Sequence, residues 1–176
     1  MFPFRQWVSA GRFHCTSKDR MPPPTAQFLD HWPQPGTCSE ARVLASETQL
    51  ILQYTARDDA VALIQFPLVK AFQFGSPNDE ALKGHPLARS GLQRYRVHHV
   101  EHSPWIAELE KRNAVHPRHD RNTFLEHLVH YIFTFQDATL ECIACEGPFG
   151  KAEVRVFASA TDAQAAWAQL VAKVFP

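Results

Sequence analysis

The stretch HYIFTFQDATLECIACE, residues 130–146, decides the fold of this 176-residue chain. Two runs rich in aromatic and β-branched residues, 130–135 and 139–146, flank a short polar break that begins at Gln136 and Asp137. Such runs around a turn are typical of a β-hairpin. We therefore expect two antiparallel strands joined by a turn over residues 136–139.

The register predicted for this hairpin pairs Phe135 with Leu140. Side chains alternate between the two faces of a strand, so one face of the hairpin collects aromatic and small apolar residues. The other face is more polar. Its predicted cross-strand neighbours are Thr134 with Glu141 and His130 with Cys145.

A second hairpin precedes the first one in the chain. TQLILQYTA (48–56) and AVALIQF (60–66) are β-rich runs separated by Arg57-Asp58-Asp59. A two-residue turn at Asp58-Asp59 places Tyr54 opposite Leu63. Other runs with strand character are 41–46, 68–74, 94–101 and 152–158.

Two helices are indicated by their capping residues. Ser103 and Pro104 suit the N-cap and the first turn of a helix that ends before His116-Pro117. Thr161 and Gln164 form a predicted capping box for a C-terminal helix. Residues 118–128 suit a short helix less clearly. The buried stripe expected on the C-terminal helix is Trp167, Leu170, Val171 and Val174.

These elements predict an α+β fold, because strands joined by short turns pair antiparallel. We expect a mostly antiparallel, strongly curved sheet of about six to eight strands, with the mid-chain and C-terminal helices packed on it. A closed barrel is the alternative. Residues 39–176 are predicted to form one domain.

Residues 1–38 are expected to be an irregular N-terminal arm, because five prolines fall between positions 22 and 35. Met21 opens the run MPPPTAQFLDHW, so one hypothesis makes Met21 the native start and places residues 1–20 upstream of it. The alternative is an ordered arm that packs through its aromatic residues. Those residues are Phe2, Phe4, Trp7 and Phe13.

Composition argues against several classes of protein. Lysine plus arginine equals aspartate plus glutamate at 18 each, so we expect no nucleic-acid partner. The sequence has no run of eighteen apolar residues and no signal-peptide pattern, so we expect no membrane partner and a cytoplasmic location. The cysteines are interpreted as reduced thiols: Cys15, Cys38, Cys142 and Cys145.

Histidine is the unusual element, since eight of the ten lie between positions 85 and 130. Neutral imidazole is a common metal ligand. The spacing does not converge, however: His98 and His99 point to opposite faces of a strand. We therefore expect solvated or capping histidines, with no metal and no cofactor. Cys142 and Cys145 also diverge on a strand and are interpreted as core thiols.

The loop FGSPNDEALKGHPLARSGL (74–92) is long for a connection between strands. One interpretation is a short helical turn capped by Ser76 or Asn78 and ended by Gly84 and Pro86. The other is a polar rim around a ligand, beside the hairpin face of Thr134 and Glu141. The sequence leaves both open.

Three segments resemble a family of small uncharacterised bacterial proteins. They are PNDEALKGHPLARSGLQRY, HSPWIAELEKRNAVHP and HYIFTFQDATLECIA, which together span about residues 70–145. The resemblance implies no activity. Where the family has histidine in the hairpin turn, this chain has Gln136, which weakens any role of that position in binding metal or moving protons.

The function expected from these features is binding of a small polar ligand or a partner protein at a loop-rimmed sheet face. Acidic side chains would accept hydrogen bonds, and histidines would donate them. The alternatives are a histidine-dependent metalloenzyme and an immunity or accessory interaction protein; whether the chain is an enzyme and its oligomeric state stay open. The candidate ligand-binding residues are Asn78, Asp79, Glu80, His85, His130, Thr134 and Glu141.

Overall fold

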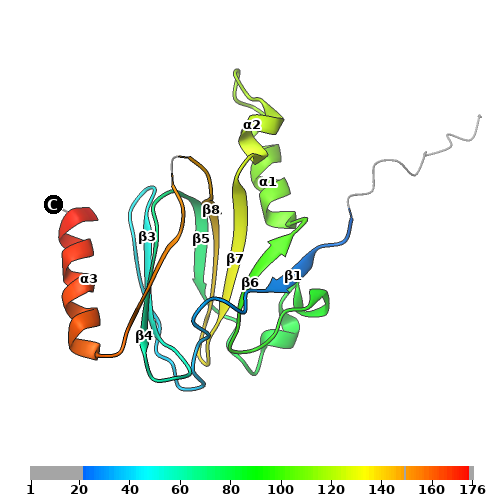
Figure 1. Cartoon of the computed structure of the whole chain (residues 1–176). Coiled ribbons are helices and arrows are strands. Elements are labelled where there is room, and N and C mark those ends of the chain that lie inside the picture. Colours follow the sequence, from blue (N-terminus) through cyan, green and yellow to red (C-terminus); the bar gives the residue numbers. More distant parts are fainter. Residues whose placement is uncertain (1–21, 149, 175–176) are drawn as a thin grey trace, which may run out of the picture.

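The computed structural model describes residues 22–148 and 150–174. These residues form an α+β fold with two antiparallel sheets, as Figure 1 shows. The α+β class and the antiparallel pairing are confirmed. The strands divide between two open sheets instead of one curved sheet, and the closed-barrel alternative is not observed.

The first sheet has the strand order β1-β6-β7-β8-β5. The bounds of its strands are Thr25–Phe28 for β1, Val97–Glu101 for β6, Leu128–Thr134 for β7, Thr139–Cys145 for β8 and Val69–Gly75 for β5. The second sheet has the order β2-β3-β4-β9. Its strands are Arg42–Ala45, Leu50–Thr55, Val61–Phe66 and Glu153–Phe157.

The main core lies between the two sheets, where the inward side chains of both meet. Tyr54, Phe66 and Phe133 are at most 1 % exposed there. Tyr54 and Phe133 meet edge to face, with ring centroids 6.1 Å apart. Burying such aromatic rings supplies much of the stability of a small domain. The alternating runs of the sequence therefore supply the two faces of one core.

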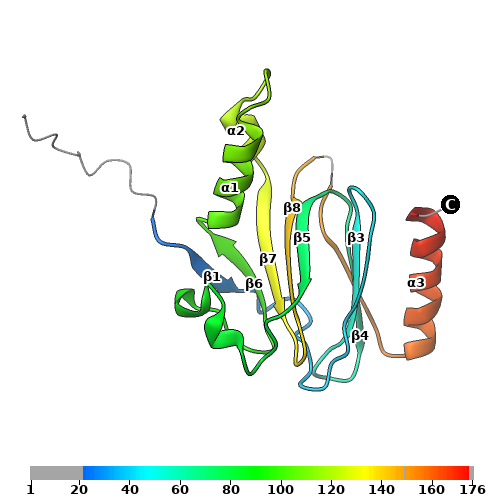
Figure 2. The ribbon, with the colours of Figure 1, turned by 180° about the vertical axis from the view of Figure 1, so that it is seen from behind.

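Helices cover the outer faces of both sheets (Figures 1 and 2). The α3 helix, Ala160–Val174, packs on the four-stranded sheet through Ala166 and Leu170, which meet Ile51 and Leu63. On the five-stranded sheet lie α1 (Pro104–Asn113) and α2 (Arg121–Leu125). The short helices η2 (Leu82–Gly84) and η3 (Ala88–Ser90) lie on the same face, where Leu82 and Leu87 pack against Ala26, Val100 and Ile132.

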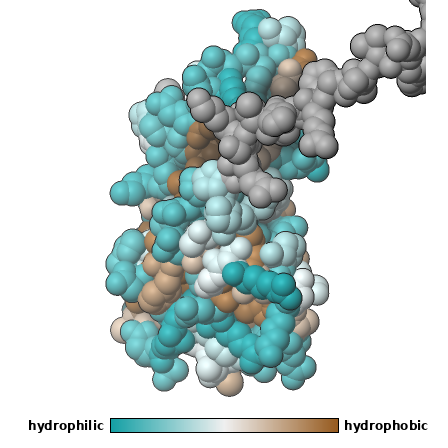
Figure 3. Space-filling view, turned by 90° about the vertical axis from the view of Figure 1, so that its right-hand side faces the viewer, coloured by the Kyte–Doolittle hydropathy of each residue, from teal (hydrophilic) through white to brown (hydrophobic). Residues whose placement is uncertain are grey.

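The side of the molecule that carries α1 and β1 is mostly hydrophilic in Figure 3, with hydrophobic side chains visible in the hollows. Within the described ranges, no helix is both long enough and apolar enough to cross a membrane.

Both predicted hairpin registers were wrong. Thr55 pairs with Val61, because the loop has three residues and Asp59 adopts φ 61°. In the β7–β8 hairpin, Phe133 pairs with Leu140, and the Phe135 amide donates to the Ala138 carbonyl at 2.9 Å. That second shift is two residues, so every side chain keeps its predicted face.

The stretch that the prolines predicted to be irregular contains strand β1, which pairs antiparallel with β6. Trp32 packs into the core against Tyr131, with ring centroids 5.1 Å apart. The Tyr54 hydroxyl donates to the Pro33 carbonyl. Residues 22–38 thus belong to the folded body. The hypotheses on Met21 as the start and on an ordered aromatic arm concern residues outside the described ranges.

Helix starts depend on local contacts and were predicted well at α1. Ser103 Oγ accepts from the Ile106 amide at 3.2 Å, which confirms the predicted N-cap. At α3 the cap is Ser159 instead of Thr161, because Ser159 Oγ accepts from the Thr161 amide at 3.1 Å. Of the predicted buried stripe, Leu170 is buried and Trp167 and Val174 pack half-buried against the same cluster, while Ala163 and Ala166 are buried small residues that the prediction missed.

Candidate functional site

A buried carboxylate on the outer face of the five-stranded sheet is the centre of the candidate site. Glu141, on β8, is 6 % exposed and receives three side-chain hydrogen bonds. His85 Nε2 lies 3.1 Å from its Oε1, and His130 Nε2 lies 3.0 Å from its Oε2. The Gln73 amide on β5 also donates to Oε1. Three separate segments therefore converge on one carboxylate.

The loop between β5 and β6 brings His85 to this position. His85 follows η2, and its Nδ1 accepts from the Leu87 amide at 3.1 Å. Since Nδ1 acts as an acceptor, the ring hydrogen of neutral His85 must lie on Nε2. The local turn thus aims an N–H group at Glu141.

His130, on β7, is held between two elements. Its Nδ1 lies 2.8 Å from Ser103 Oγ, the same oxygen that caps α1. Trp105, in the first turn of α1, meets the His130 ring edge to face with centroids 5.4 Å apart. Because the start of α1 is tied to the imidazole, the helix and the sheet share one hydrogen-bond network.

Hydrogen bonding keeps Glu141 ionised in spite of its burial. Burial by itself raises the pKa of a carboxyl group. At Glu141 the hydrogen bonds and charges of His130 and His85 outweigh that effect and lower its pKa to about 2. Glu141 itself is therefore negatively charged at neutral pH.

This charge faces a cavity of about 300 Å³. Its floor is polar, and its walls are mostly rigid apolar groups from the loop and from α1. Prolines restrict the backbone of these walls. The residues that line the cavity are Gln73, Ser76, Pro77, His85, Pro86, Leu87, Pro104, Trp105, His130 and Glu141.

Of the seven residues expected at a ligand site, the structure brings together His85, His130 and Glu141. The other four lie elsewhere in the loop and at the end of β7. Asn78 caps the loop by accepting from the Ala81 amide at 3.0 Å. Thr134 donates to the Gln93 carbonyl at 2.8 Å. These two side chains hold backbone in place and do not line the cavity.

Asp79 and Glu80 also lie outside the cavity. Asp79 accepts a hydrogen bond from the Tyr95 hydroxyl, and its amide donates to the Gln136 carbonyl at 2.9 Å. Glu80 is exposed. The first half of the loop is thus a capped turn, as in one interpretation. The second half supplies His85 to the cavity.

Sequence reasoning missed three groups that complete the site: Gln73, Ser103 as a partner of His130, and Trp105. Gln73 lies between Phe72 and Phe74 on β5, so its alternation could have marked a polar residue on the Glu141 face. The contact of Trp105 with His130 carries no local signal, because it joins α1 to β7.

Other chemistries have less support in the described residues. No group of three or more His, Cys, Asp or Glu side chains among them is placed to hold a metal ion. Cys145 pairs with Leu128, so the predicted pairing of Cys145 with His130 was wrong. Cys142 is fully buried, and burial raises the pKa of its thiol. Ser103 already accepts the α1 cap bond and is 6 % exposed, which does not favour a nucleophile.

Comparison of the chain with protein-family models, curated proteins and solved structures found no match.

Proposed function

We propose that the protein binds a small cationic or donor-rich ligand in the Glu141 cavity. The observation that carries this proposal is a buried carboxylate that its hydrogen-bond partners keep ionised and that still lines a cavity. An ionised carboxylate offers about four acceptor positions, and the protein fills three of them at Glu141. One acceptor position remains for a ligand N–H group.

The cavity walls suit the apolar part of such a ligand. Trp105 and Leu87 present apolar surface, and Pro77, Pro86 and Pro104 stiffen it. Burial against rigid walls binds alkyl groups with little loss of side-chain entropy. The indole of Trp105 also attracts a cation held within about 6 Å of its ring. A small alkyl ammonium therefore matches both the charge and the walls.

The rival explanation is a structural clasp in which Glu141 only fastens the loop and α1 to the sheet. Replacing His85 would not separate the two explanations, because His85 is itself buried in the network. Trp105 is a better probe. It is half-buried, lines the cavity and forms none of the hydrogen bonds to Glu141.

The test is a titration of the ¹⁵N-labelled full chain with small primary alkyl ammonium ions and with the alcohols of the same length, followed by NMR. We expect saturable shifts around Gln73, His85 and His130 with the ammonium ions alone. Glu141→Gln and Trp105→Leu should each weaken binding about tenfold or more. Trp167→Leu, a half-buried tryptophan on α3, is the matched control. If the unchanged chain binds no ammonium ion, and Glu141→Gln and Trp105→Leu both unfold more readily than it does, the structural clasp is established instead.

A further inference from the structure

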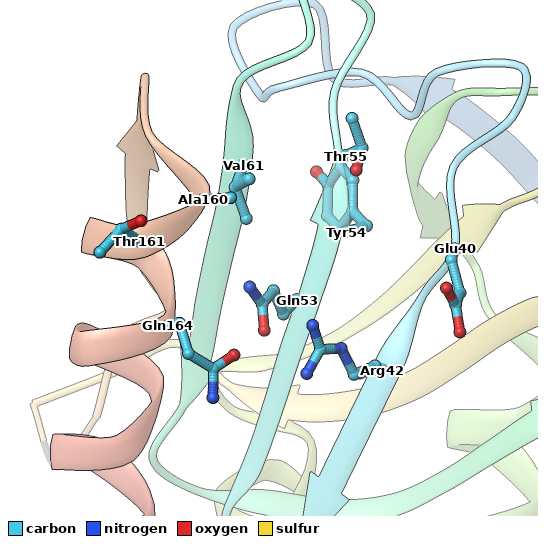
Figure 4. A pocket seen from close by; sticks show the side chains of 9 residues that line it. All are labelled: Glu40, Arg42, Gln53, Tyr54, Thr55, Val61, Ala160, Thr161 and Gln164. Carbon is cyan, nitrogen blue, oxygen red and sulfur yellow. The ribbon is translucent and has the colours of Figure 1, made fainter.

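A second cavity lies on the opposite side of the molecule, between α3 and the four-stranded sheet. Its volume is about 520 Å³. It lies where α3 begins, beyond the apolar contacts that fasten the rest of the helix to the sheet. Figure 4 shows the residues that line it: Glu40, Arg42, Gln53, Tyr54, Thr55, Val61, Ala160, Thr161 and Gln164.

Gln53 is the informative residue of this cavity. It lies on β3, is 6 % exposed, and its amide oxygen has no hydrogen-bond partner within the part of the chain that the structure describes. Buried polar groups without partners are rare, since they cost stability. A leucine of similar size would pack here without that cost, so Gln53 marks this cavity as a place where a bound molecule can supply the missing hydrogen bond.

Two side chains near Gln53, those of Arg42 and Gln164, can donate hydrogen bonds into the cavity. Arg42 pairs with Gln53 across β2 and β3, and Figure 4 shows its guanidinium extending toward Gln53. Gln164 extends from α3 toward the same space. Gln53 Oε1 is an acceptor, and an anion supplies no hydrogen to it. Rotating the amide by 180° exchanges Oε1 and Nε2, so that an N–H group takes the unpartnered position, and Gln164 can turn an N–H group toward the same space. Arg42 adds a planar fork of N–H donors, which suits an oxyanion.

The charges around the cavity also favour an anionic ligand. Within residues 22–148 and 150–174, Arg42 forms no ion pair with an acidic side chain. The positive end of the α3 dipole adds to its field. The first amides of α3 donate to Ser159, so the side chains must make the direct contacts. Glu40 carries the opposing charge. In Figure 4 its side chain lies on the far side of Arg42, away from Gln53 and Gln164.

We infer that this cavity binds the carboxylate or phosphate group of a small anion through Arg42, Gln53 and Gln164. The site is separate from the Glu141 cavity, because it lies on the outer face of the other sheet. The two sites can therefore be tested independently.

The experiment titrates the ¹⁵N-labelled full chain with sodium succinate, sodium phosphate and neutral succinamide at constant ionic strength. We expect saturable shifts in β2, β3 and the first turn of α3 with at least one of the two anions, and none with succinamide. The stronger of the two responses assigns the group as carboxylate or phosphate. The absence of a saturable response to both anions at millimolar concentration overturns the inference.

Three substitutions separate binding from folding. Arg42→Gln should weaken anion binding about tenfold or more, while Arg118→Gln, at an exposed arginine on the other sheet's side, should not change it. Glu40→Gln should strengthen binding about twofold, since it removes a nearby like charge. Gln53→Leu should raise the midpoint of thermal unfolding and weaken binding together. Equal affinity in Arg42→Gln, Gln53→Leu and the unchanged chain overturns the inference.

Discussion

His85 Nε2 lies 3.1 Å from Glu141 Oε1, although 56 residues separate them in the sequence. This contact fastens the long loop after β5 to the middle of the five-stranded sheet. Both side chains are more than nine-tenths buried. The Leu87 amide fixes the ring of His85, so a local turn and a long-range hydrogen bond support each other.

Replacing His85 tests the strength of that contact. His85→Leu should lower the free energy of unfolding by about 2 kcal/mol or more, because a buried carboxylate loses a donor. Urea unfolding measures the change. His31→Leu is the control: its contact with Asp30 is exposed, so we expect a change within about 0.5 kcal/mol. An equally small effect of His85→Leu would contradict the structural role of the contact.

Glu141 predicts an acid-sensitive step in stability. Its pKa is lowered from 4.5 to about 2 in the folded chain, so the unfolded chain binds more protons between these values. The stabilisation is fully present above pH 4.5 and is lost as the pH falls to 2, with a size of about 3 kcal/mol. The free energy of unfolding should fall more between pH 5 and pH 2 for the unchanged chain than for Glu141→Gln. Parallel pH profiles would show that folding does not lower the pKa of Glu141.

His98 predicts a second step at higher pH. It is fully buried on β6, its Nε2 accepts from the Gln93 amide at 3.2 Å, and burial lowers its pKa to about 4. The unfolded chain therefore binds the proton first, and stability falls as the pH drops from 6.5 to 4. The loss attributable to His98 is about 3 kcal/mol. His98→Gln should reduce the loss of stability between pH 6.5 and pH 4 and leave the loss below pH 4.5 in place. A steep loss that persists in this variant would assign the window to another group.

Trp32 tests whether residues 22–38 are part of the cooperative unit. The indole packs against Phe66, Tyr131 and Phe133, with ring centroids 5.1 to 6.4 Å apart. Trp32→Ala should cost about 3–5 kcal/mol, which is typical of a large aromatic removed from a core. Urea unfolding followed by circular dichroism measures it. A cost below about 1 kcal/mol would show that this segment packs only loosely.

Features that depend on neighbouring residues could be predicted from the sequence. The Ser103 cap needs only the geometry of one helical turn, and the β7 and β8 runs show their strand character locally. The registers of the strand pairs were harder to predict from the sequence. The φ of 61° at Asp59 lengthens one loop to three residues, and nothing in the Arg57-Asp58-Asp59 triplet distinguishes that loop from a two-residue turn.

The candidate site was predicted in part for the same reason. His130 and Glu141 lie on the two strands of one hairpin, and a register error of two residues left them on one face. Asn78 and Asp79 were expected beside them because of their place in the loop. Their side chains instead serve the backbone of Ala81 and the hydroxyl of Tyr95.

The sequence by itself determined the antiparallel α+β character, the position of most strands, the start of α1 and the face on which Glu141 lies. These depend on alternation, turn residues and caps, which act over a few residues. The tertiary structure decided the division into two sheets, the incorporation of Trp32 and the meeting of His85 with Glu141. Those outcomes depend on which distant surfaces bury each other most completely, and no local pattern records that competition.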